Sequence, residues 1–146
     1  QYQHPRSFEN FPYKMKIEKI TVNFSDERGS ITDIVNSLDF NGATIIKSKT
    51  GCIRGNHYHK KTIQYVYILE GKMKSTAKKI NEEIEVAIVG PGDLVSHESY
   101  EAHNFEALED TTFLVLSSGL RSGKDYEKDT YRLSSTIEQF SDKEIS

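Results

Sequence analysis

The sequence predicts an all-β protein, folded as an antiparallel sandwich or barrel. Short runs of alternating apolar and polar residues recur about every 8–12 residues, with Gly, Pro, Asn or Asp between them. The apolar residues show no helical period before the C-terminal tail, so helices are not expected in the main body. A chain of 146 residues is long enough to form one domain with a hydrophobic core.

The expected strands follow one another with recognisable turns between them. They cover residues 16–24, 30–35, 43–49, 62–69, 72–79, 84–89, 94–96, 103–108 and 111–117. Gly29 ends the turn that begins at Asp26 and can adopt a positive φ, and residues 70–71 and 90–93 are strong turn formers. The run over residues 62–69 is apolar on both faces, which is typical of a central strand.

The chain divides into an N-terminal arm over residues 1–15, a β-domain over 16–120 and a C-terminal tail over 121–146. The arm is either loose or docked on a neighbouring subunit through its aromatic residues. In the tail, residues 131–140 could carry one short helix. The tail is either solvated or folded back over the mouth of the barrel, where Tyr126 or Tyr131 could supply a catalytic acid.

Composition excludes several classes of function. A net charge of -3 without a basic run argues against a nucleic-acid surface, and no apolar run approaches the ~20 residues of a membrane-spanning helix. Cys52 is the only cysteine, so no intrachain disulfide is expected. The first residues lack a signal-peptide pattern. We therefore expect a cytoplasmic protein that binds neither nucleic acid nor a membrane.

Three histidines and one amide form the candidate site. His57 and His59 are two residues apart on an extended segment, so their side chains share a face. Gln64 lies an odd number of residues later, and a turn at residues 60–61 would bring it alongside them by starting a new strand. His103 follows in a later strand. A single histidine at a strand end usually bonds backbone or water, but this pattern favours a shared site inside the barrel.

These residues resemble the cupin superfamily. Residues 51–71 are similar to the first cupin motif, and residues 91–93 followed by His103 are similar to the second. The resemblance implies a jelly roll, or double-stranded β-helix, with the histidines inside it. Many cupins bind a divalent metal there. In this chain Gln64 stands where the family usually has a carboxylate, and a neutral amide is a weaker ligand for a hard cation.

A narrower resemblance concerns the segment around the histidines. Residues 54–61 with Gln64 resemble the signature of the WxcM-like sugar-nucleotide 3,4-ketoisomerases, and residues 26–30 resemble the turn in that family's N-terminal strand region. Residues 102–105 are similar to a stretch of the dTDP-4-dehydrorhamnose 3,5-epimerases. In the ketoisomerases a Gln occupies the carboxylate position, and the resemblance implies catalysis without a metal.

The resemblance implies acid–base chemistry on a 4-keto sugar. A base removes the C3 proton and an enediol forms; a proton returned at C4 then moves the carbonyl to C3. His57 is the expected base, because both related families place their base there, and His59 would carry the second proton or hold the enediolate oxygen. The expected substrate-binding residues are Arg28, Arg54, Gln64 and His103, the two arginines on a diphosphate. His97 has no matched role and is interpreted as peripheral.

We expect an isomerase or epimerase that acts on a dTDP-4-keto-6-deoxyhexose, in deoxysugar or surface polysaccharide biosynthesis. No cofactor is expected. The chain should form a homodimer, with the face of Tyr65 and Tyr67 packing between sheets or subunits. Two alternatives remain open. One is a metal-dependent cupin enzyme that holds Zn, Mn, Fe or Ni, with the ligands His57, His59, Gln64 and His103. The other is a non-catalytic cupin that binds a small molecule.

Overall fold

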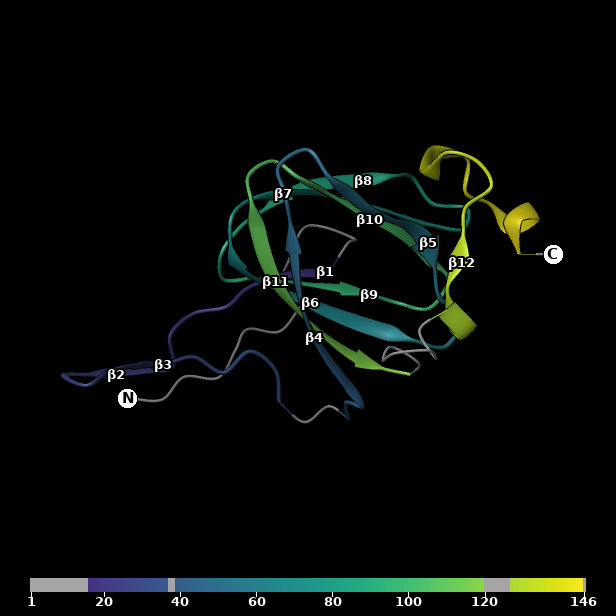
Figure 1. Ribbon diagram of the computed structural model, residues 1–146. Helices are drawn as coiled ribbons and strands as arrows, with labels where there is room; N and C mark the ends of the chain where they lie inside the picture. The colour runs from purple at the N-terminus through teal and green to yellow at the C-terminus, as the bar shows by residue number, and fades with distance from the viewer. Residues whose placement is uncertain (1–15, 37–38, 120–126, 146) are drawn as a thin grey trace.

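Two antiparallel sheets of five strands each lie face to face (Figure 1). The computed structural model describes residues 16–36, 39–119 and 127–145. From β4 to β12, each strand lies in the other sheet from the strand before it, except that β8 pairs with β7 in the same sheet. This arrangement is the jelly roll that the sequence predicts.

The strands of the first sheet are, in spatial order, β1 (Lys16–Lys19), β9 (Asp93–His97), β6 (Ile63–Glu70), β11 (Thr111–Ser118) and β4 (Gly42–Ser48). The strands of the second sheet are β12 (Tyr131–Arg132), β5 (Ile53–Tyr58), β10 (Glu101–Ala107), β7 (Met73–Lys79) and β8 (Glu85–Val89). The remaining two strands, β2 (Phe24–Asp26) and β3 (Gly29–Ile31), pair only with each other. Every pairing is antiparallel. Because side chains alternate between the two faces of a strand, one face of each sheet fills the interior.

The interior is built by strict alternation along the central strands. On β6, Gln64, Val66 and Ile68 are buried, whereas Tyr65 and Tyr67 lie half-buried on the opposite face. β11 alternates in the same way. The apolar core contains Val66, Ile68, Met73, Val95, Phe105, Phe113 and Val115. Gln64 comes before the apolar pair on β6, so a polar layer lies next to the apolar core inside the same barrel.

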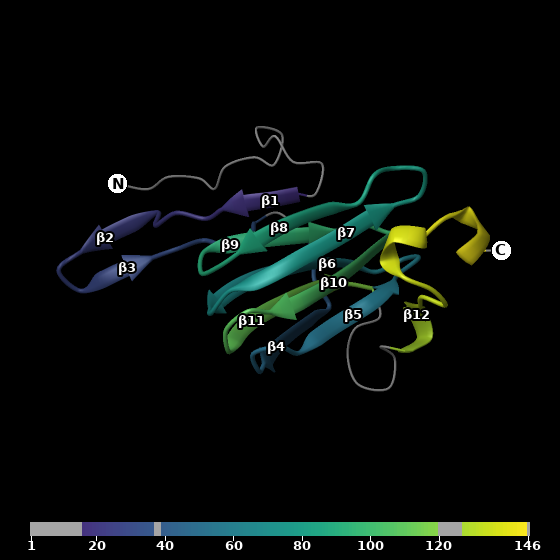
Figure 2. The ribbon, with the colours of Figure 1, turned by 90° about the horizontal axis from the view of Figure 1, so that it is seen from above.

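The N-terminal region departs from prediction. The single strand expected over residues 16–24 is two strands, because β1 pairs with β9 only as far as Lys19 and the chain then leaves the sheet. The expected strand over 30–35 ends at Ile31. The turn at residues 26–29 is confirmed as a hairpin, in which Gly29 has a φ of 130°. Figures 1 and 2 show this hairpin projecting away from the two sheets, on the side opposite the C-terminal turns.

The short helix expected over residues 131–140 is wrong. Within the described part of the tail, β12 is followed by two 3-10 turns, η3 (Ile137–Gln139) and η4 (Asp142–Glu144). The reason is tertiary: Ile137 and Phe140 pack with Tyr58 and Ala102 in a second apolar cluster outside the barrel. Contact with the sheet, rather than an internal helical period, decides where these apolar side chains lie. No helix in the described ranges is long and apolar enough to cross a membrane.

Candidate active site

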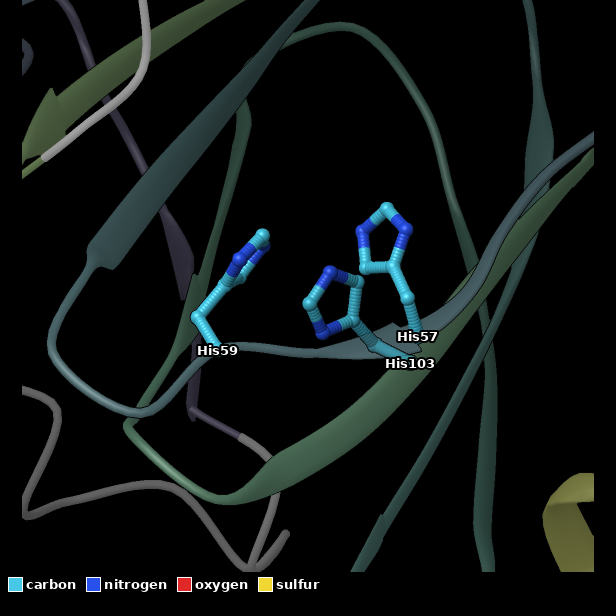
Figure 3. A group of neighbouring side chains, drawn as sticks. All are labelled: His57, His59 and His103. Carbon is cyan, nitrogen blue, oxygen red and sulfur yellow. The ribbon is translucent and has the colours of Figure 1, made fainter. Parts of the chain in front are cut away.

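The three histidines meet between the sheets. His57 on β5 lies directly opposite His103 on β10, and His59 follows β5. The ring centroid of His57 lies 4.9 Å from that of His59 and 4.8 Å from that of His103. Figure 3 shows all three rings on the same side of these segments. Each histidine is at most 6% exposed, so the cluster is an interior feature.

A β-bulge at Asn56 turns His57 inward. Opposite β5, His103 pairs with His57 while the next residue, Asn104, pairs with Gly55, so Asn56 is an extra residue in the strand. Asn56 has a φ of 58°, and its side-chain oxygen accepts a hydrogen bond of 2.8 Å from the amide of Asn104. Without the extra residue, Arg54 and His57 would face opposite sides; with it, both line the same cavity.

Gly55 makes this bulge possible. Its φ is 107°, in a backbone region that residues other than glycine rarely adopt. A Cβ atom there would lie 2.7 Å from the carbonyl oxygen of His103. The neighbouring strand therefore approaches the backbone of Gly55 too closely for any side chain. The Gly-Asn pair before His57 is the sequence signal for this bulge, although the strand prediction alone does not reveal it.

A cavity of about 390 Å³ opens beside the histidines. Its polar lining consists of Arg54, His57, Gln64, His103 and Arg132. Its floor is apolar and includes Val66 and Phe113. The cavity thus combines a hydrophobic base with a few convergent polar groups, which is the ordinary composition of a small-molecule site. No carboxylate belongs to this lining in the described part of the chain.

The four expected core residues of the site do not all have the same access to the cavity. Gln64 reaches it from β6 on the facing sheet, and His57 and His103 reach it from the second sheet. His59 is only 1% exposed and is not part of the lining. His57 is therefore the outer and His59 the inner member of the His-x-His pair.

The two expected phosphate-binding arginines are separated. Arg54 lines the cavity, and Ser48 and the carbonyl oxygen of Lys47 accept hydrogen bonds of 2.7 and 2.9 Å from its guanidinium. Arg28 lies on the projecting β2–β3 hairpin, where it pairs with Asp26 at 2.6 Å. It is not a lining residue of the cavity in its own chain.

Arg132 is a lining residue that the sequence analysis missed. Pairing of β12 with β5 places it directly opposite His57, and its guanidinium donates to Glu127 at 2.9 Å. No local pattern marks it, because its place at the cavity depends on a strand pairing between distant segments. Tyr131, the described one of the two tyrosines considered as acids, instead stacks on Tyr58 with centroids 5.3 Å apart. Tyr126 lies outside the described residues.

The interpretation of His97 as peripheral is wrong. His97 is 1% exposed and stacks on His103, with parallel rings 4.1 Å apart. It also pairs across the strands with Gln64. Neither of its ring nitrogens has a hydrogen-bond partner in the described part of the chain. Its burial could not be predicted, since it lay beyond the expected end of its strand.

Burial keeps two of the histidines neutral. Loss of solvent contact, reinforced by the neighbouring histidines, lowers the pKa of His97 well below its ordinary value. Burial likewise lowers the pKa of His103 to about 3. The Nδ1 of His103 lies 3.0 Å from the carbonyl oxygen of Glu101, which can only accept, so Nδ1 carries the proton. His103 therefore offers Nε2 as a hydrogen-bond acceptor and does not act as an acid near neutral pH.

A jelly roll with a buried histidine cluster and a polar cavity between its sheets defines a cupin-type barrel. The chain belongs to the polysaccharide biosynthesis C-terminal domain family, which matches residues 24–131. No curated protein sequence gives a significant match.

Several solved structures with the same fold are sugar-nucleotide isomerases and epimerases. A double mutant of the QdtA 3,4-ketoisomerase from Thermoanaerobacterium thermosaccharolyticum, in complex with TDP, is 25% identical, with a TM-score of 0.67 over 84% of this chain and 90% of that chain. The dTDP-4-dehydrorhamnose 3,5-epimerase from Sulfolobus tokodaii is 18% identical, with a TM-score of 0.72 over 98% and 94% of the two chains. ChmJ, a 3'-monoepimerase from Streptomyces bikiniensis, is 16% identical, with a TM-score of 0.69 over 84% and 72%. The expected resemblance to both enzyme groups is confirmed.

Proposed function

We propose that this chain is a sugar-nucleotide isomerase or epimerase that acts on a dTDP-4-keto-6-deoxyhexose by proton abstraction through an enediol. Its product would serve deoxysugar or surface polysaccharide biosynthesis. The observation that carries the proposal is a buried histidine, His57, at a cavity whose polar lining is a neutral amide, another histidine and two arginines. The family and the enzymes that share the fold support the same class of substrate.

In this proposal His57 is the general base. A carbonyl at C4 makes the C3 proton acidic, and a neutral imidazole at the cavity wall can accept it. His59, the inner ring, does not line the cavity, so of its two expected roles it would carry the second proton, through His57, rather than hold the enediolate oxygen. Its centroid is 4.9 Å from that of His57, so a proton could pass between the two rings without leaving the site.

Gln64 and His103 would hold the sugar from opposite sheets. The amide of Gln64 donates and accepts, whereas neutral His103 accepts at Nε2 from a sugar hydroxyl. A carboxylate at position 64 would raise the basicity of every nearby imidazole. The neutral amide leaves the histidines free to exchange protons with the substrate.

Arg54 and Arg132 are the proposed anchors for the diphosphate. Both line the cavity, and a guanidinium fork pairs with two phosphate oxygens at once. Arg28 could contribute only from a second copy of the chain, because its hairpin projects away from the two sheets and Arg28 does not line the cavity between them. Its role in substrate binding thus depends on the predicted homodimer. Light scattering at micromolar concentration should give twice the monomer mass, and a monomer would remove Arg28 from the site.

A metal enzyme is the second candidate, and one observation favours it. The possible ligand atoms of His57, His59 and His103 all lie within 4.8 Å of one another. Three neutral imidazoles fit a zinc, iron or nickel ion better than manganese, and Gln64 would be a weak fourth ligand. Bound there, a divalent ion would polarise the keto oxygen as a Lewis acid. Elemental analysis of the purified protein would reveal a stoichiometric ion.

The test of the proposed function is turnover of a defined substrate. Purified protein is mixed with dTDP-4-keto-6-deoxyglucose in deuterated water, with and without EDTA, and followed by NMR. The proposal expects deuterium at C3 of the recovered substrate or of an epimeric product, or at C4 of a 3-keto product, in each case unaffected by EDTA. A chain that binds the nucleotide sugar but causes neither change is a non-catalytic binding cupin.

A further inference from the structure

The segment over residues 127–133 packs along β5, the strand that carries His57. Its strand β12 extends the second sheet at the edge of β5, where Arg132 pairs with His57. Leu133 donates its backbone N–H to the carbonyl oxygen of Asn56 at 3.0 Å, beside the bulge. Asp129 lies at the other end of the segment, against the turn that connects β5 to β6. The C-terminal segment thus contacts the histidine strand on both sides of His57.

The carboxylate of Asp129 collects the donors of that turn. Its two oxygens accept hydrogen bonds from the backbone N–H groups of Lys60, Lys61 and Thr62 at 3.0, 3.0 and 2.8 Å. The hydroxyl of Thr62 adds a fourth hydrogen bond at 2.8 Å. Asp129 is 4% exposed, so these bonds form away from water. A single buried side chain therefore holds the turn that separates His59 from Gln64.

The backbone of the same residue reaches the histidine itself. The carbonyl oxygen of Asp129 lies 2.8 Å from Nδ1 of His59. A carbonyl oxygen can only accept, so a neutral His59 carries its proton on Nδ1 and leaves Nε2 as its basic nitrogen. The carboxylate of Asp129 holds this residue against the turn, and the backbone carbonyl oxygen of Asp129 determines the tautomer of His59.

We propose that Asp129 is a positioning residue, which fixes the orientation and the Nδ1–H tautomer of His59. Its consequence for catalysis rests on the proposed function, in which His59 exchanges a proton. The assignment of the His59 tautomer does not rest on the proposed function, because a tautomer can be measured without substrate. The proposal also assigns a task to the C-terminal segment, which would otherwise only cover the sheet.

The test reads the tautomer directly. Long-range ¹⁵N–¹H correlation spectra of ¹⁵N-histidine-labelled protein, in EDTA at about pH 8, separate Nδ1–H from Nε2–H rings. His59 is assigned by comparison with His59→Gln. Wild type should show the Nδ1–H form. Asp129→Ala and the nearly isosteric Asp129→Asn, which cannot accept all four hydrogen bonds, should shift His59 towards a mixture of tautomers.

A matched control exists elsewhere in the chain. The carboxylate of Asp110 accepts from the backbone N–H and the hydroxyl of Thr50, both at 2.9 Å, in a local cap of the same kind. Asp110→Ala should leave the tautomer of His59 and the turnover unchanged. In the Asp129 variants, kcat should fall about 10–100-fold with a smaller change in KM.

Two results would overturn the proposal. One is an Nε2–H ring at His59 in wild type, a result that needs no Asp129 variant and holds even if Asp129→Ala fails to fold. The other is an unchanged tautomer in folded Asp129→Asn. If wild type turns over no sugar nucleotide but shows the expected tautomer and its loss in Asp129→Asn, the proposed function fails and the positioning role of Asp129 stands.

Discussion

The replacement His57→Asn tests the central assignment of this site. Asparagine keeps a hydrogen-bonding side chain in the wall of the cavity but cannot accept the C3 proton. Loss of a general base should slow exchange at C3 by about 10²–10⁴-fold, which corresponds to roughly 2.7–5.5 kcal/mol in the barrier. His57 is 6% exposed and in ring contact with two histidines, so the smaller side chain should also cost about 1–2 kcal/mol of stability.

The assay is hydrogen–deuterium exchange at C3 of dTDP-4-keto-6-deoxyglucose, followed by NMR with and without EDTA. A binding titration with TDP should show nearly unchanged affinity, since His57 is not a proposed phosphate ligand. The matched control is His97→Phe, which alters another buried histidine, outside the cavity lining, and keeps the stacking on His103. It should retain exchange within about tenfold of wild type.

Each outcome has a separate meaning. Exchange that survives EDTA in wild type and is lost in His57→Asn supports the metal-free base. Exchange that EDTA abolishes refutes the metal-free mechanism and favours the metal enzyme. Unchanged exchange in His57→Asn refutes the assignment of His57 and directs attention to His59.

Three further predictions concern the same barrel. Gln64→Glu should tighten zinc binding at least tenfold in a calorimetric titration, because a carboxylate joins three imidazoles; equal affinities would show that the amide is not at the ion site. Gly55→Ala should lower the free energy of unfolding in urea by more than about 2 kcal/mol, because its Cβ would meet a carbonyl oxygen at 2.7 Å, while the control Gly51→Ala, with φ of 88° and open space, should cost about 1 kcal/mol. His97→Phe should make the free energy of unfolding less sensitive to acid, because the pKa of His97 is lower in the folded than in the unfolded protein. Wild type therefore loses stability as pH falls below about 6.5, by up to about 1.4 kcal/mol per pH unit from this residue. Parallel slopes for wild type and His97→Phe between about pH 5 and 6, in EDTA, would contradict that prediction.

The sequence alone was sufficient for most of the architecture. Alternation over residues 62–69 predicted a central strand with Gln64 facing inward, and β6 has that orientation. The pair His57 and His59 predicted a shared face, and their rings lie together. These features were predictable because side-chain direction along a strand depends on the local backbone, which neighbouring residues determine.

Other parts of the site required the tertiary structure. Arg132 reaches the cavity because β12 pairs with β5, and His97 belongs to the cluster because β9 places it over His103. The hydrogen bond between His59 and Asp129 joins residues 70 positions apart. Such contacts depend on the register between distant strands and on which side chains the completed sheets bury, and neither quantity is a property of any short stretch of sequence.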